Sequence, residues 1–439
     1  MKRNLTKSKE YFDIAKRLIP CQTQCLSKGP TQWINNVAPH YLKGGKGCRV
    51  WDVDGNEYID YAMGLGPVVL GYGNESVDNA IKKQLEDGIS FTLCHYLEVE
   101  LAEKLVDILP CAEMVRYGKN GSDVTSAAIK VARSYTGRDK IIACGYHGWQ
   151  DWYVASTERD RGIPKVMKDL VFTFRYNDIE GLASILDKNK GEISAVIMEP
   201  VTAIKPEKGF LEEVKKLTHE AGAILIYDEM FTGFRWSLGG AQEYFNVIPD
   251  LACFGKAMAN GMPLSTLVGK EELMRELEKV FYSFTFGGEA LSLAASIATI
   301  KEIEEKNVIE YIWDKGQMMI DDVKKLIEKN GVSSYLDIMG YPPKSIMVFK
   351  ETGEYTTMEM KTFFQQECIK RGILFIGYHT LSLAHRDSDI KETLAVYDEV
   401  MGLFKNAVES GDLKDRLEGP VLTQIFKNVG DRSAGLAKR

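Results

Sequence analysis

The 439-residue sequence lacks any run of 18 apolar residues, so it predicts no helix that spans a membrane. It also lacks a surplus of basic residues, since 55 lysines and arginines stand against 62 aspartates and glutamates, a net charge of −7. A protein that binds nucleic acid needs a basic face to neutralise phosphates, so this balance argues against that class. The first ten residues are charged and no apolar segment follows them, which argues against a secretion signal and predicts a cytoplasmic protein.

Patterns that hold metals or disulfides are missing as well. The eight cysteines are scattered without a CxxC pair, and the six histidines show no spacing typical of metal ligands. The sequence therefore predicts reduced, mostly buried thiols and no metal site. It contains no internal repeat, no Walker loop, no HExxH and no GxSxG motif.

The middle of the chain alternates between two kinds of segment. Helical patterns such as Val124–Tyr135 and Leu211–Ala221 lie between short apolar runs that are near-continuous, as in strands covered on both faces. This alternation predicts an α/β domain with a mostly parallel sheet. The apolar runs are Ile141–Cys144, Ala195–Met198, Ala223–Tyr227 and Leu251–Phe254.

The two ends of the chain have a different pattern. Val50–Val53 and Tyr58–Tyr61 flank an Asp-Gly turn and predict a hairpin. Beyond residue 300 the chain is richer in charged helical sequence, with short strands expected around Ser345–Phe349 and Ile373–Ile376. We therefore expect one large domain and a smaller α+β domain built from both ends. The expected segments are 1–75 (small domain), 76–300 (large domain) and 301–439 (small domain).

Two ionisable residues follow predicted strands. Asp228 comes directly after the run Ala223–Tyr227, and Lys256 lies just beyond the run Leu251–Phe254. Ligands of parallel sheets gather at the carboxyl ends of the strands, so both side chains are candidates for a site. Taken singly, each has an ordinary explanation: a helix N-cap or a solvated strand end for Asp228, and a solvated surface charge for Lys256.

Two further segments have the chemistry of ligand contacts. Asn120, Gly121 and Ser122 precede a helical stretch, where small residues leave backbone N–H groups open to a phosphate and Ser122 adds a hydroxyl. Tyr146 follows the run Ile141–Cys144 and is placed to stack on a flat ring. The alternatives are an ordinary capped helix and plain core packing. Together, a phosphate turn, an aromatic ring, an acid and a lysine are what pyridoxal phosphate requires. The lysine forms a Schiff base with the cofactor, and the acid keeps the pyridine nitrogen protonated, so that the charged ring withdraws electrons.

The order of the motifs resembles the class III aminotransferases, which are pyridoxal-phosphate enzymes of fold type I. Within that class the sequence is most similar to the glutamate-1-semialdehyde aminomutase branch, from about Ile19 to about Val400. The motifs that carry the resemblance are Trp51–Asn56, Ala132–Arg138, Tyr146–Gly148, Glu199–Val201, Tyr227–Arg235, Gly255–Gly261 and Ser382–His385.

The resemblance implies a role for each matching residue. Lys256 matches the Schiff-base lysine, and Asp228 matches the partner of the pyridine nitrogen. Tyr146 and Met230 match the residues on the two faces of the ring. Asn120, Gly121 and Ser122 match the phosphate-binding turn, and Thr285 matches a threonine that binds the phosphate across a subunit boundary. The resemblance therefore implies a homodimer with shared active sites that acts on a small amino donor and a carbonyl acceptor.

Three departures from the aminomutase branch concern the substrate. Gly377 stands where that branch has an acidic residue, Ile204 where it has an asparagine, and Thr23–Lys28 where it has an arginine for the substrate carboxylate. A pocket without those contacts should bind the aminomutase substrate poorly. We therefore expect a ping-pong aminotransferase whose acceptor is an amino-aldehyde, a keto acid or a keto-sugar. Intramolecular amino transfer of the aminomutase type is one alternative, and a non-catalytic protein that has kept the fold is another.

Overall fold

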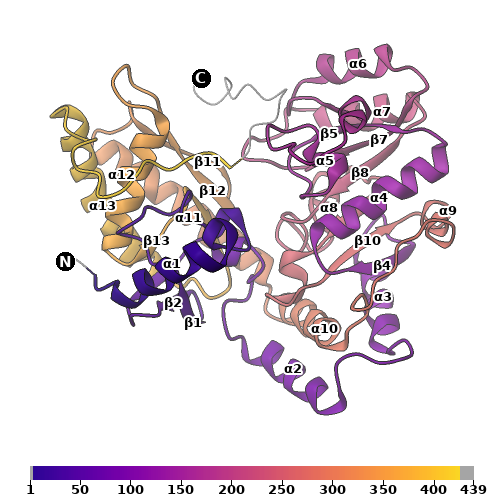
Figure 1. Cartoon of the computed structure of the whole chain (residues 1–439), viewed down its shortest axis with the longest axis horizontal. Coiled ribbons are helices and arrows are strands. Elements are labelled where there is room, and N and C mark those ends of the chain that lie inside the picture. Colours follow the sequence, from indigo (N-terminus) through magenta and orange to yellow (C-terminus); the bar gives the residue numbers. More distant parts are fainter. Residues whose placement is uncertain (1–2, 426–439) are drawn as a thin grey trace. The chain divides into compact units, whose positions relative to one another are not determined.

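The chain divides into two compact units (Figure 1). The computed structural model describes residues 3–425; residues 1–2 and 426–439 of the expected small-domain segments lie outside that range. The small unit comprises residues 3–74 and 310–425, and the large unit comprises residues 75–309. The large unit extends past residue 300 because helix α10 (Ala290–Glu305) packs on α2 (Glu75–Asp87) and α3 (Leu97–Ile108).

A seven-stranded sheet forms the centre of the large unit. Its order is β4-β10-β9-β8-β7-β5-β6, with β5 to β9 parallel and β10 antiparallel to both of its neighbours. The mostly parallel sheet agrees with the prediction, whereas strands β4, β6 and β10 were not anticipated. The strands are β4 (Met114–Gly118), β5 (Lys140–Cys144), β6 (Val171–Thr173), β7 (Ile193–Met198), β8 (Ile224–Asp228), β9 (Leu251–Phe254) and β10 (Ser265–Gly269).

Helix α4 (Gly121–Thr136) covers one face of this sheet, where it packs on β7, β9 and β10. Its buried Val124 and Ala128 belong to one hydrophobic core with Ile197 and Cys253 of the strands. Strands β7, β8, β9 and β10 are buried at every position. For β7, β8 and β9 this explains why the sequence shows near-continuous rather than alternating apolar runs. The other α-helices of the large unit are α5 (Asp151–Val154), α6 (Ile179–Lys188), α7 (Phe210–Glu220), α8 (Ala241–Phe245) and α9 (Glu271–Met274).

The small unit holds two small sheets, ordered β1-β2-β3-β13 and β11-β12-β14. Its predicted hairpin is confirmed: β2 and β3 pair antiparallel, and the Asp52 carboxylate accepts hydrogen bonds from the N–H groups of Asp54 and Asn56 in the turn. Gly55 adopts a φ of +91° there, which an L-residue rarely takes. The elements are α1 (Thr6–Leu18), β1 (Leu42–Lys46), β2 (Arg49–Asp52), β3 (Glu57–Asp60), α11 (Val308–Lys329), β11 (Leu336–Tyr341), β12 (Lys344–Phe349), α12 (Thr357–Lys370), β13 (Ile373–Leu374), β14 (Tyr378–Thr380) and α13 (Asp387–Glu409).

The core of the small unit contains two buried histidines. His379 bonds the hydroxyl groups of Ser345 and Tyr397 at 2.9 and 2.8 Å, and the ring of Tyr61 stacks on His385. Burial lowers the pKa of His379 to about 3 and that of His385 to about 4. Both rings are therefore neutral in the folded protein at neutral pH.

Within residues 3–425, no helix is both long and apolar enough to cross a membrane. The same range contains no group of three histidine, cysteine, aspartate or glutamate side chains arranged to hold a metal ion. The eight cysteines are free thiols, and five of them are buried.

Candidate active site

The residues that the sequence singled out lie along one edge of the large sheet. Strand β10 runs antiparallel to both β9 and β4, so β4, β5, β8 and β9 all point in the same direction. Their carboxyl ends therefore share an edge, where ligands of such sheets bind. Asn120 follows β4, Tyr146 follows β5, Asp228 ends β8, and Lys256 comes two residues after β9.

Asp228 is held by a buried hydrogen-bond pair. Its Oδ2 lies 2.8 Å from Nδ1 of His147, and its Oδ1 accepts the N–H of Met230 at 3.1 Å. Nε2 of His147 lies 3.2 Å from the carbonyl oxygen of Cys144, so each ring nitrogen faces an oxygen atom. His147 and Asp228 are 2% and 4% exposed, so water competes little for this bond.

The sequence patterns did not single out His147 as a partner of Asp228. It stands between Tyr146 and Gly148, and its carbonyl oxygen accepts the hydroxyl of Thr125 from α4 at 2.9 Å. The signal in the sequence was a histidine directly after the aromatic residue that follows a buried strand. Its partner Asp228 is 81 residues further along the chain, so spacing alone did not point to the pair.

The turn before α4 is shaped by hydrogen bonds to Asp123. The Asp123 carboxylate accepts the N–H groups of Lys119 and Asn120 at 3.0 and 2.7 Å, which fixes the first turn of the helix. The Ser122 hydroxyl oxygen accepts the N–H of Trp149 at 3.2 Å, so its own hydrogen is available for another acceptor. The next residue back from Trp149 is Gly148, where an added Cβ would lie only 2.2 Å from Ser122 Oγ.

Met230 lies between the turn and the lysine. Cβ atoms added at Gly121 and Gly255 would come within 3.0 and 2.8 Å of its sulfur, so both backbones approach this side chain closely. Lys256 follows Gly255 with a φ of +44°, and its exposed side chain has the amine 5.1 Å from the ring centroid of Phe231. Gly121 at the start of α4 and Gly255 directly before Lys256 therefore both lie close to the Met230 side chain.

Tyr146 is half exposed at this edge. Its ring packs edge-on against Tyr153 at 5.6 Å, and its N–H donates to Glu199 at 3.0 Å. The preceding Gly145 has a φ of +109°, and an added Cβ there would lie 2.5 Å from Oε2 of Glu199. The Glu199 carboxylate and the turn at Gly145 thus position the backbone of Tyr146 at this edge.

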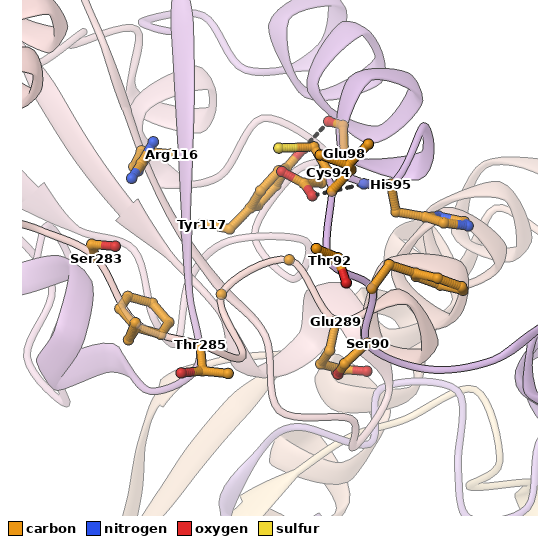
Figure 2. Close-up of a pocket in the computed structure, with 15 residues that line it drawn as sticks. Ser90, Thr92, Cys94, His95, Glu98, Arg116, Tyr117, Ser283, Thr285 and Glu289 are labelled. Carbon is orange, nitrogen blue, oxygen red and sulfur yellow. Dashed lines mark hydrogen bonds between the residues drawn. The ribbon is translucent and has the colours of Figure 1, made fainter.

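Thr285 lines a separate cavity of about 420 Å³ in the large unit (Figure 2). The cavity is bordered by the segments 90–95 and 283–289 and by Arg116 and Tyr117 of β4; Lys256, Asp228 and Ser122 are not among its lining residues. Figure 2 shows Thr285 and Glu289 together at the lower side of this cavity. None of the other predicted residues contributes to the lining of this cavity.

Comparison with known proteins identifies the family. The sequence profile of the family described as "Aminotransferase class-III" matches residues 33–385. The 3-aminobutyryl-CoA aminotransferase of Cloacimonas acidaminovorans is 36% identical over 414 residues, covering 92% of this chain and 99% of the relative. The glutamate-1-semialdehyde 2,1-aminomutase of Acetivibrio thermocellus is 39% identical over 421 residues, covering 89% and 96%.

The chain belongs to the class III aminotransferases.

A solved structure shares the whole fold. The FumI protein of Sphingopyxis sp. MTA144, in its pyridoxal-phosphate internal aldimine form, superposes with a TM-score of 0.86 at 28% identity and covers 92% of this chain and 98% of its own. The predicted α/β fold of type I is confirmed, as are the class III resemblance and the assignment as an enzyme with pyridoxal phosphate as cofactor.

The carboxyl edge fits that cofactor. A carboxylate has about four lone-pair positions, so the two hydrogen bonds described for Asp228 leave room for the N–H of a pyridinium ring. The Ser122 hydroxyl and the N-terminus of the 16-residue helix α4 suit a phosphate. Gly148 approaches Ser122 so closely that no side chain fits at position 148 between Tyr146–Trp149 and the turn Asn120–Ser122.

Proposed function

We propose that this class III aminotransferase carries out its chemistry at the carboxyl edge of the large sheet, with Lys256 and Asp228 as its catalytic residues. The observation that carries the proposal is the buried His147–Asp228 pair, which lies beside the Ser122 turn through Gly148 and Thr125. A carboxylate fixed in this way, at the end of a buried strand, is typical of a residue that must hold a positive charge on a bound ring.

Each residue has a separate task. Pyridoxal phosphate, when bound, supplies a protonated ring that withdraws electrons from the substrate carbon next to the amine. Asp228 holds the proton at the ring nitrogen, and His147 keeps the Asp228 carboxylate in position. The Lys256 amine removes a proton from the substrate carbon that carries the nitrogen and delivers it to C4′, the cofactor carbon on the other side of that nitrogen. Ser122, Asn120 and Gly121 bind the phosphate, and Tyr146 and Met230 bracket the ring.

The proposed reaction has two half-reactions. An amino donor leaves its nitrogen on the enzyme and departs as a carbonyl compound, and a carbonyl acceptor then removes the nitrogen. Ping-pong kinetics with parallel double-reciprocal lines are expected. Because one relative is named for 3-aminobutyryl-CoA, that thioester is the first donor to test, with keto acids, amino-aldehydes and keto-sugars as acceptors. Lines that intersect for every active pair would contradict the two-step scheme.

The residue at position 377 supports amino transfer between two substrates rather than the aminomutase reaction. Gly377 has a φ of +108°, and an added Cβ would lie 2.8 Å from Cε of Lys361. An acidic side chain, as the aminomutase branch has here, is therefore strained at this position. Glutamate-1-semialdehyde supplied without any second substrate separates the two reactions. We expect no turnover of it, and its conversion at a rate equal to that of donor–acceptor pairs would support the aminomutase.

We further propose a homodimer in which Thr285 binds the cofactor phosphate of the neighbouring protomer. The support is the position of Thr285 in a cavity apart from Lys256, and the exposed Phe91, Leu93 and Phe284 that line the same cavity. Exposed apolar side chains grouped in this way mark interaction surfaces. Native mass spectrometry tests the dimer; a monomeric holoenzyme with full activity would refute it. The cytoplasmic location stays a prediction from sequence.

A further inference from the structure

An ion pair joins the phosphate turn to the Thr285 segment. Nζ of Lys119 lies 2.8 Å from Oε1 of Glu289, and the two side chains are only 13% and 9% exposed. Lys119 directly precedes Asn120, and Glu289 lies four residues after Thr285. Burying a charged side chain without a partner costs free energy, so the Lys119 and Glu289 side chains are held to one another. We therefore expect this pair to be better ordered than an exposed salt bridge.

Glu289 is the anchor at the end of the Thr285 segment. Its carboxylate accepts the N–H groups of Leu291 and Ser292 in the first turn of α10, at 3.0 and 3.2 Å. Burial raises the pKa of Glu289, but the hydrogen bonds from Lys119 and Ser292 outweigh it and hold that pKa below its usual range. The Glu289 carboxylate thus bonds both the first turn of its own helix and Lys119, the residue directly after β4.

The other end of the segment is also attached to β4. The Tyr282 hydroxyl donates to the carbonyl oxygen of Tyr117 at 3.1 Å, and Arg116 donates to the carbonyl oxygen of Tyr282 at 3.0 Å. Thr285 therefore lies on a stretch fixed at Tyr282 and at Glu289. The Lys119 amine supplies the bond that links Glu289 to the phosphate turn.

The phosphate turn of the same protomer is held by other bonds. The Asp123 carboxylate accepts the N–H groups of Lys119 and Asn120, and the Ser265 hydroxyl donates to the carbonyl oxygen of Asn120 at 2.8 Å. None of these bonds uses the Lys119 side chain. Removing the Lys119 amine therefore loosens the Thr285 segment and leaves the protomer's own turn in place.

We propose that Lys119, acting through Glu289, is a positioning residue for Thr285, and so controls how tightly the neighbouring protomer holds the cofactor phosphate. The inference rests on the proposed homodimer with shared sites. It predicts that a change at Lys119 weakens cofactor binding in the partner's site and not in its own.

Differently tagged protomers, co-expressed and purified as mixed dimers, test this directly. In the first mixed dimer, one protomer carries Lys256→Ala and Lys119→Met and the other is unchanged. In the second, one protomer carries Lys256→Ala and the other Lys119→Met. Each dimer has one Lys256 site, whose release of pyridoxal phosphate after dilution is followed by its visible absorbance. We expect release about tenfold faster from the first dimer and an unchanged rate from the second, the size expected for one bond to a charged group.

Two controls separate the possible failures. Lys119→Arg in place of Lys119→Met keeps the charge and should restore slow release, and the thermal unfolding midpoints of all dimers should agree. A third mixed dimer, with Lys256→Ala and Thr285→Ala in one protomer, tests the shared site itself. If it releases cofactor at the unmodified rate, the shared site and the role of Lys119 both fall. If it releases cofactor quickly but the first dimer does not, or if both Lys119 dimers change equally, the shared site stands and the role of Lys119 is refuted.

Discussion

Removing the imidazole of His147 should slow amino transfer by a predictable amount. His147→Leu deletes the hydrogen bond to Asp228 Oδ2, which is 2.8 Å long and buried. A hydrogen bond to a charged group contributes about 1.5–3 kcal/mol. If the loss of this bond raises the activation free energy by the whole amount, kcat falls by roughly 10- to 150-fold, because 1.4 kcal/mol is a factor of about ten.

A conservative variant separates positioning from packing. His147→Asn places an amide N–H in the direction of Nδ1 while it gives up the contact of Nε2 with the Cys144 carbonyl. Steady-state kinetics with a donor and an acceptor at varied concentrations should show kcat reduced in the leucine variant and largely restored in the asparagine variant. KM should change by less than about threefold in both, since His147 is buried behind Asp228 and is only 2% exposed.

Three results would refute this reasoning. The first is an unchanged kcat in His147→Leu. The second is an equal loss in the leucine and asparagine variants, which would assign His147 to packing with Trp152 and Tyr153. The third is a loss confined to KM, which would place His147 in substrate binding rather than behind Asp228.

Two other predictions concern shape and acid stability. Gly148→Ala should weaken cofactor binding at least tenfold because its Cβ would displace the Ser122 hydroxyl. Gly162→Ala, which has a φ of +88° and open space around its Cβ, should leave binding unchanged, and fluorescence titration of the apo-protein with pyridoxal phosphate compares the two. His379 and His385 have lowered pKa values of about 3 and 4, so the unfolded chain binds more protons below pH 6.5 and stability falls as the pH drops toward those values. From pH 6.5 to 5 each should cost about 2 kcal/mol, and denaturant unfolding of His379→Asn should show a smaller loss than the unmodified protein; equal losses would contradict the assignment.

Local patterns predicted those parts of the fold that local physics decides. The run Ala223–Tyr227 is apolar throughout because β8 is covered on both faces, and Asp228 follows where the strand reaches the edge of the sheet. The turn at Asp54 and Gly55 likewise depends on neighbouring residues, since the Asp52 carboxylate closes it. Such features are encoded within a few residues, so a single sequence is enough to find them.

What the sequence did not reveal depends on distant partners. Strand β10 runs antiparallel in a mostly parallel sheet, and its direction is decided by pairing with β4 and β9 rather than by its own residues. The contact of His147 with Asp228 and that of Lys119 with Glu289 each join residues far apart in the chain. Lys256 has a left-handed backbone, with a φ of +44°, and no residue preference predicts that conformation for a lysine.

The central claim is that Lys256 is the amine that holds pyridoxal phosphate and moves the proton. The direct measurement is borohydride reduction of the holoenzyme, followed by digestion and mass spectrometry of the peptides. We predict one pyridoxyl modification, on the peptide that contains Lys256, and its absence together with loss of amino transfer in Lys256→Ala. Modification of a different lysine, or amino transfer by Lys256→Ala at the unmodified rate, would contradict the claim.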